Sequence, residues 1–304
     1  MYSGPVIDAH HHLWDLSLGK HPWLLPGSAA EQVIGSLGGI RRDALVDDYL
    51  QATAGQNLQA SVHIEALWEA SGPLAETRWL DALDKTRGVA SRYVVAAPLG
   101  TPDAVAVLEA HLASPRVTGV RAILSWHPGQ PAKCFAARPG MALEAAWRRD
   151  AAFLARRGLS LDLMLYPYQV DEVLDLAAAL PELQIIVNHC GSPVDRDIEG
   201  MQRWLRGLRR LASADNIAIK VSNIAGYDHA VSTEVYRATV LQCIDCFGVT
   251  RTLFGSDWPV AGLHCSLASM YSGFRVALNG FSDSEQSALF CGNAARLYRV
   301  EQIL

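Results

Sequence analysis

The sequence lacks the features of a membrane protein and of a nucleic-acid-binding protein. No apolar run approaches the ~20 residues that a membrane-spanning helix needs, and we expect neither a signal peptide nor a membrane partner. The 26 basic residues are scattered and the formal net charge is -5, so we also expect no nucleic-acid partner. The densest basic cluster has the three-to-four spacing of a solvated helix face and consists of Arg203, Arg206, Arg209 and Arg210.

The six cysteines do not show the spacing of a disulfide framework. Cys243 and Cys246 form a C-x-x-C pair, but their helical spacing in an apolar stretch favours buried thiols over a redox or zinc pair. Free thiols persist in a reducing compartment, so we expect a cytoplasmic protein.

What the sequence does contain is a regular alternation of short apolar runs and amphipathic segments. Half of the 304 residues are hydrophobic, and the length suits one α/β barrel of ~250 residues. Strands that alternate with helices pair in parallel through right-handed crossovers. The sequence therefore predicts an α/β fold, a (β/α)8 TIM barrel that forms one domain over residues 1–304. The predicted strands are Val6–His10, Leu58–Ile64, Arg92–Ala97, Val117–Leu124, Leu159–Leu165, Leu183–Asn188, Ile217–Val221 and Thr252–Ser256, and the clearest helices are Ala142–Arg157, Val170–Leu180 and Met201–Ala212.

Two segments depart from this alternation. Leu16–Asp43 is rich in glycine, proline and tryptophan, and we interpret it as an elaborated loop after the first strand. Near the C-terminus, Ser282 is placed to cap a helix that reaches Phe290, and a last, separate helix is expected over Ala294–Tyr298.

The first predicted strand carries the clearest chemical signal. Asp8, His10 and His12 alternate, and the side-chain period of two places all three on one face of a strand. His11 must then point the other way, into the packing layer. Three consecutive histidines also occur in affinity tags and loose metal-binding tracts, but apolar residues frame these on both sides. We therefore expect His10 and His12 to converge on a metal ion or a substrate oxygen.

Other capable side chains follow other strands, at the barrel end where active sites form. Asp257 follows the eighth strand and would meet the first-strand histidines as a metal ligand or a proton acceptor, unless it only caps a turn. His189 follows the sixth strand as a further ligand or a donor to a carbonyl oxygen. Arg121, inside the fourth strand, either pairs internally or binds a substrate carboxylate. Less certain candidates near the same rim are Trp14, His63, Glu65, Trp126, His127 and Tyr166.

Together these motifs resemble the amidohydrolase superfamily, and within it the amidohydrolase-related branch that contains lactonases. The resemblance covers nearly the whole chain. Its motifs are Ile7–Asp15, His21–Leu24, Gly119–Arg121, Asn188–Gly191 and Phe254–Pro259. By this resemblance, the family's strand-one histidine pair, strand-six histidine and strand-eight aspartate correspond to His10, His12, His189 and Asp257.

The resemblance implies hydrolysis of a small lactone, either sugar-derived or of the muconolactone type. Asp257 would be the general base, and His10, His12 and His189, or one divalent ion such as Zn²⁺ or Mn²⁺, would polarise the carbonyl. The fourth strand offers no lysine and the fifth no histidine, so two metals are not expected. The branch contains metal-bound and metal-independent lactonases, which leaves one metal or none. Glu65 is a further possible metal ligand.

Substrate recognition is expected beside this centre. Arg121 and an aromatic rim would hold the rest of the substrate, which we expect to be a polar ring compound. The rim residues are Trp14, Trp126 and Tyr166. Glu65 and His127 are further candidates for substrate binding. Specificity should depend on the loops Leu16–Asp43, Trp68–Leu74 and Trp126–Ala137. A homodimer is the default assembly.

Two other functions fit the same motifs. Zinc-dependent decarboxylases of the superfamily share the barrel and a similar ligand set, and release of CO₂ would distinguish them from lactonases. A non-catalytic barrel that binds a metabolite would keep its ligand after His10→Ala or Asp257→Asn and would hydrolyse no lactone.

Overall fold

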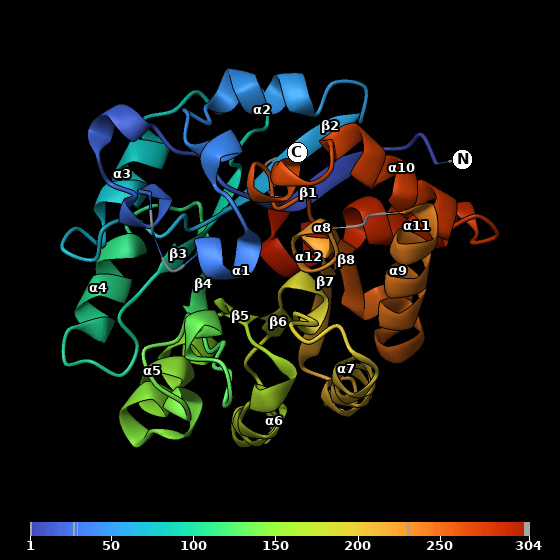
Figure 1. The fold of residues 1–304 in the computed structure, drawn as a ribbon. Coiled ribbons are helices and arrows are strands. Elements are labelled where there is room, and N and C mark those ends of the chain that lie inside the picture. The colour runs from blue at the N-terminus through green and yellow to red at the C-terminus, as the bar shows by residue number, and fades with distance from the viewer. Residues whose placement is uncertain (1, 27, 29, 230–231, 301–304) are drawn as a thin grey trace.

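The computed structural model describes residues 2–26, 28, 30–229 and 232–300, and its strands form one eight-stranded sheet in sequence order (Figure 1). Each neighbouring pair in this order is parallel. The strands are β1 Val6–His11, β2 Leu58–Ile64, β3 Arg92–Ala96, β4 Val117–Ile123, β5 Ser160–Met164, β6 Ile185–Val187, β7 Ile217–Val221 and β8 Thr252–Phe254.

The barrel closes where β1 meets the chain after β8. The Asp257 N–H donates to the His10 carbonyl at 2.7 Å, and the His12 N–H donates to the Trp258 carbonyl at 2.8 Å. Close approach requires glycine at position 255, because a Cβ there would lie 2.6 Å from the Cβ of His10. The predicted TIM barrel is confirmed.

Helices surround the strands (Figure 1). Several begin at a side chain that accepts a backbone N–H, as Asp197 does from Gly200 and Ser232 from Val235. None of the helices in the described part of the chain is long and apolar enough to cross a membrane. The helices are α1 Glu31–Ile34, α2 Val46–Ala52, α3 Ala75–Asp81, α4 Ala104–His111, α5 Ala145–Arg156, α6 Val170–Ala179, α7 Ile198–Leu211, α8 Ile224–Tyr227, α9 Thr233–Phe247, α10 Leu267–Ala277, α11 Asp283–Ser287 and α12 Asn293–Tyr298.

The C-terminal helices differ from the prediction of two separate segments. A π-helical turn, Ala288–Gly292, joins α11 directly to α12. At this junction the side-chain amide of Asn293 donates to the carbonyls of Val249 and Thr252, beside β8. These hydrogen bonds hold the junction of the two helices against the barrel. The cap at Ser282 is as predicted, with Glu285 completing a capping box.

The segment between β1 and α2 contains short helical turns and crosses the mouth of the barrel. Besides α1, it forms 3-10 turns at Leu16–Leu18, Pro22–Leu24 and Gly38–Ile40. In Figure 1, α1 lies over the middle of the barrel. The segment is therefore a cap above the strand ends.

A polar network lies inside the barrel below its mouth. The Lys220 ammonium group contacts the Asp162 carboxylate at 2.6 Å, and both side chains are fully buried. The same carboxylate accepts hydrogen bonds from the Tyr298 hydroxyl of α12 at 2.8 Å and from the Asn188 amide at 3.0 Å. Lys220 also lies 3.5 Å from Nδ1 of His10, so this network supports the strand-one histidine from below.

Because a buried charge without its partner is costly, we expect Lys220→Met to lower the free energy of unfolding by ~3–5 kcal/mol. The double variant Lys220→Met/Asp162→Asn removes both charges and should recover part of this loss. Urea unfolding of the wild type and both variants measures the difference. Equal stability of Lys220→Met and the wild type would contradict a role for the pair in holding the barrel.

Candidate active site

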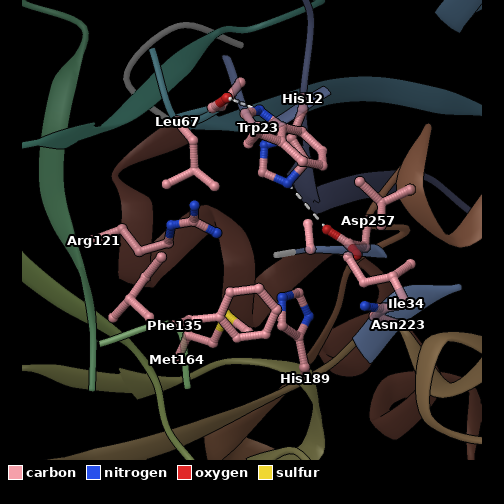
Figure 2. Close-up of a pocket in the computed structure, with 14 residues that line it drawn as sticks. His12, Trp23, Ile34, Leu67, Arg121, Phe135, Met164, His189, Asn223 and Asp257 are labelled. Carbon is pink, nitrogen blue, oxygen red and sulfur yellow. Dashed lines mark hydrogen bonds and ion pairs between the residues drawn. The ribbon is translucent and has the colours of Figure 1, made fainter. Parts of the chain in front are cut away.

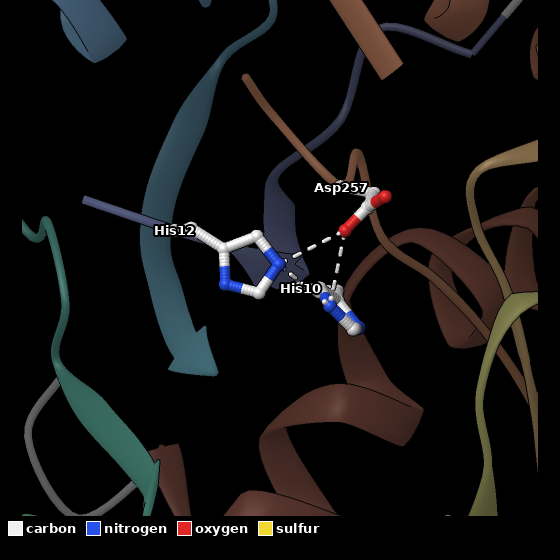
Figure 3. Close-up of side chains that lie close together, drawn as sticks. All are labelled: His10, His12 and Asp257. Atoms are coloured by element: carbon white, nitrogen blue, oxygen red, sulfur yellow. Dashed lines mark hydrogen bonds and ion pairs between the residues drawn. The ribbon is translucent and has the colours of Figure 1, made fainter. Parts of the chain in front are cut away.

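Two histidines and one aspartate form a buried cluster at the carboxyl end of the barrel. His12 and Asp257 border a cavity (Figure 2), and His10 completes the cluster (Figure 3). Oδ1 of Asp257 lies 3.2 Å from Nε2 of His10 and 3.1 Å from Nε2 of His12. The two Nε2 atoms are 3.3 Å apart. The Nε2 atoms of both histidines and the Oδ1 atom of Asp257 are thus all directed toward a common position.

The first strand shows why only two of its three alternating polar residues reach this point. The β1–β2 register shifts between Asp8 and His11. Asp8 therefore faces α2. It accepts hydrogen bonds from Tyr49 of α2 and from Ser256, which follows β8. The expectation that Asp8 shares a face with the two histidines is wrong. His11 stacks on Tyr49 in the packing layer, as predicted.

His12 has a fixed orientation. Its Nδ1 lies 2.8 Å from the Ile64 carbonyl oxygen, which only accepts, so Nδ1 carries the proton. In the neutral ring, Nε2 then presents a lone pair to the carboxylate oxygen of Asp257 at 3.1 Å. A metal ion bound between these two atoms would accept both lone pairs, with the Ile64 carbonyl as the outer partner that orients the His12 ring.

The donor set fits a divalent ion. Ligand atoms bound ~2.0–2.2 Å from a tetrahedral Zn²⁺ lie roughly 3.3–3.6 Å from one another. The three atoms here lie within 3.1 to 3.3 Å of one another, slightly closer than in a loaded site. Two imidazoles and a carboxylate are the donors of many catalytic zinc sites. His10, His12 and Asp257 are therefore the residues that could hold a metal.

Burial and neighbouring charges set the protonation of the cluster. Burial acts to raise the pKa of Asp257, but the adjacent imidazoles of His189, His10 and His12 outweigh it and hold that pKa well below its usual value. Burial, reinforced by the Lys220 charge, lowers the pKa of His10 well below its ordinary value. At neutral pH the cluster therefore contains an ionised carboxylate beside a neutral His10.

His189 approaches the cluster from β6. Its backbone has a φ of 53°, in the left-handed region, and its ring lies 4.7 Å from that of His10 between ring centres. Nδ1 lies 2.9 Å from the Ser222 hydroxyl. Burial lowers the pKa of His189 to about 4, so the ring is neutral at pH 7. His189 borders the cavity, but its ring nitrogens do not belong to the group of ligand atoms formed by His10, His12 and Asp257.

Arg121 also borders the cavity, and it has an internal partner. Both Nε and a terminal nitrogen of its guanidinium lie 2.5 Å from Oε1 of Glu65, and both side chains are almost fully buried. The other carboxylate oxygen of Glu65 accepts the Leu67 N–H. Of the two possibilities for Arg121, internal pairing is therefore realised, at a position that also faces the cavity.

The predicted aromatic rim lies elsewhere. Trp14 is fully buried and donates to the Arg42 carbonyl, and Tyr166 is fully buried and donates to the Lys133 carbonyl. Trp126 accepts a hydrogen bond from Gln169 through its carbonyl. These side chains are not among the described residues that line the cavity, so their roles in binding remain predictions.

Two further histidines pair outside the cavity. His127 lies 3.1 Å from the Asp195 carboxylate, which also accepts from Tyr168. His63 faces outward from β2, and its Nε2 lies 3.0 Å from Oε1 of Glu76 on α3. Neither borders the cavity in the described part of the chain.

The cavity wall contains residues that the sequence analysis did not single out. They are Trp23, Ile34, Leu67, Ile123, Phe135 and Met164. Trp23, Ile34 and Phe135 lie in two of the three loops predicted to control specificity, but apolar residues in a loop carry no individual signal of this role. The cavity encloses about 60 Å³.

Comparison with known proteins places this site in a family. The amidohydrolase family model matches residues 7–300, and the chain belongs to this family. It is 36% identical to protein y4mH of Sinorhizobium fredii, over 97% of this chain and 98% of the relative. It is 29% identical to an L-fucono-1,5-lactonase of Burkholderia multivorans, over 97% of this chain and 96% of the relative.

A solved structure supports the same assignment. A Burkholderia multivorans amidohydrolase with bound zinc matches with a TM-score of 0.79 and 25% identity, over 97% of this chain and 99% of that chain. The family predicted from the motifs is confirmed.

The pair of His63 and Glu76 gives a testable pH dependence. Burial, with help from the charge of Glu65, raises the pKa of Glu76 from 4.5 to about 8. The folded state thus holds a proton that the unfolded state has lost, and the wild type should lose stability as pH rises from about 4.5 to 8. The Glu76→Gln variant has no carboxyl group at this position, so this titration does not affect its stability.

We therefore expect the melting temperature of Glu76→Gln to rise relative to that of the wild type as the pH increases from 5 to 9. Thermal unfolding in matched buffers measures this. A constant difference across the range would show that Glu76 is not protonated in the folded protein.

Proposed function

We propose that this protein hydrolyses a small lactone. The observation that carries the proposal is a buried carboxylate, Asp257, that contacts two imidazoles at the edge of a cavity. The 29% identity to a protein named L-fucono-1,5-lactonase agrees with it. Lactone opening needs a base for the attacking water and groups that stabilise the oxyanion, and this site supplies both.

Asp257 and His189 have separate tasks. Asp257 accepts the proton of the attacking water, because its low pKa keeps it ionised at neutral pH. The neutral His189 borders the same cavity, where a ring N–H can donate to the carbonyl oxygen of the lactone as negative charge develops. A donor of this kind contributes ~3 kcal/mol to the stabilisation of an oxyanion.

His10, His12 and Asp257 would hold one divalent ion, with Zn²⁺ as the first candidate. When bound, such an ion polarises a carbonyl and lowers the pKa of water to ~7. The Ile64 carbonyl orients His12 in either case, because it holds the proton on Nδ1 and directs Nε2 toward Asp257.

Asp257→Asn should abolish hydrolysis, with a loss of at least ~10³-fold in kcat, because the amide cannot accept the proton. Asp175→Asn, on the exposed face of α6, is the control and should keep full activity. A pH-indicator assay over a panel of sugar and muconolactone-type lactones measures both variants. Full activity of a folded Asp257→Asn protein would contradict the proposal.

The metal assignment has its own measurement. We expect one Zn²⁺ or Mn²⁺ per chain, and we expect His12→Ala to lose it because one of three ligands is removed. His229→Ala, a change at an exposed histidine, should retain the ion. Elemental analysis after dialysis gives the stoichiometry, and equal metal content in the two variants would rule out this site.

Activity before and after chelation then defines the chemistry. Loss of turnover that added Zn²⁺ or Mn²⁺ restores would establish a metal-dependent lactonase. Turnover that chelation leaves unchanged would mean that the histidines alone stabilise the oxyanion. Absence of turnover with every lactone, together with CO₂ release from an aromatic acid, would favour the decarboxylase function instead.

A further inference from the structure

The cavity lining is mostly apolar, with a few polar side chains. The polar side chains are His12, Arg121, His189, Asn223 and Asp257, and the larger apolar ones include Trp23, Leu67, Ile123, Phe135 and Met164. In Figure 2, Phe135 and Met164 lie between Arg121 and His189. A substrate whose ester group contacts Asp257 must therefore place the rest of its ring against hydrocarbon.

The apolar wall comes from several independent elements. Trp23 belongs to the cap above the barrel mouth, Leu67 follows β2, and Ile123 ends β4. Phe135 comes from the loop after β4, and Met164 ends β5. Five separate places in the chain thus contribute an apolar side chain to the lining of this cavity.

The charge balance of the cavity disfavours an anionic substrate. Arg121 is the one Lys or Arg side chain among the described lining residues, and Glu65 binds two of its nitrogens at 2.5 Å. The pair is therefore neutral overall. A substrate carboxylate would lose its hydration and would meet, in Arg121, a cation whose charge Glu65 already balances, which is costly in a buried site.

Hydroxyl groups face a related cost. Each hydroxyl that leaves water without a new hydrogen bond weakens binding, because its hydrogen bonds to water are lost. The side chains of Ile123, Phe135 and Met164 offer no hydrogen bond to a hydroxyl on the ring.

We infer that the substrate is a neutral lactone with a small, apolar ring body, such as an alkyl-substituted five- or six-membered lactone. Polyhydroxylated aldonolactones and lactones that carry carboxylates are then poor substrates. This inference rests on the proposed lactonase function and names its substrate class. It differs from the expectation of a polar ring compound, which was based on a tryptophan-rich rim and on Arg121.

A matched pair of substrates tests the inference. L-Fucono-1,5-lactone and δ-hexalactone share a six-membered ring with one methyl group, and they differ in the hydroxyls of the sugar lactone. We expect kcat/KM, divided by the uncatalysed rate of each compound, to be at least ~10-fold higher for δ-hexalactone. 2-Pyrone-4,6-dicarboxylate represents the anionic class and should be turned over more slowly still.

The outcomes separate this inference from the function on which it rests. Preference for δ-hexalactone supports the inference. Equal or greater preference for the sugar lactone or the dicarboxylate overturns the inference while lactone hydrolysis stands. Absence of turnover with these three compounds and with the reactive lactone dihydrocoumarin overturns the proposed function itself.

A substitution in the wall provides an independent readout. Met164→Gln adds a hydrogen-bonding group and should shift the ratio of the two kcat/KM values toward L-fucono-1,5-lactone by ~10-fold, mainly through KM. Met201→Gln, on the outer helix α7, is the matched control and should leave the ratio unchanged. An unchanged ratio in a folded Met164→Gln protein would contradict contact between the wall and the substrate.

Discussion

The site depends on the main-chain seam between β1 and the segment after β8. Two backbone hydrogen bonds across this seam place Asp257 beside His10 and His12, which come from the opposite end of the chain. The absence of a side chain at Gly255 permits the approach. Asp257 itself has a φ of 54°, a conformation that such a short polar side chain tolerates better than most. The catalytic geometry is thus a property of barrel closure.

Beneath this seam, the interior changes from polar to apolar in layers. The cluster at the mouth lies above the ion pair of Lys220 and Asp162, and below that pair an apolar layer from the strands packs against α12. The two charges of the middle layer compensate each other, and the Asp162 carboxylate also accepts from Tyr298 and Asn188. This arrangement places the Lys220 charge 3.5 Å from His10.

Sequence patterns predicted the strands and the meeting of His10, His12 and Asp257, because strand periodicity and barrel closure are local and topological rules. They did not predict the side on which Asp8 lies, since a register shift has no signature in a single sequence. Asp162 was also missed, because one acid within an apolar strand resembles a solvent-facing residue. Trp14 and Tyr166 were placed at the rim, whereas burial and backbone hydrogen bonds hold them in the core.

The role of α12 in filling the barrel has a consequence for how the chain reaches its fold during synthesis. Tyr298 binds Asp162 inside the barrel, and Ala294 packs among side chains of the strands. The ribosome releases these residues almost three hundred positions after β1. Until then, the C-terminal helix that packs against the lower end of the barrel cannot contact the first strand or the histidines at its end. Contacts of such long sequence separation form late and slow folding, so the site assembles only when nearly all of the chain is available.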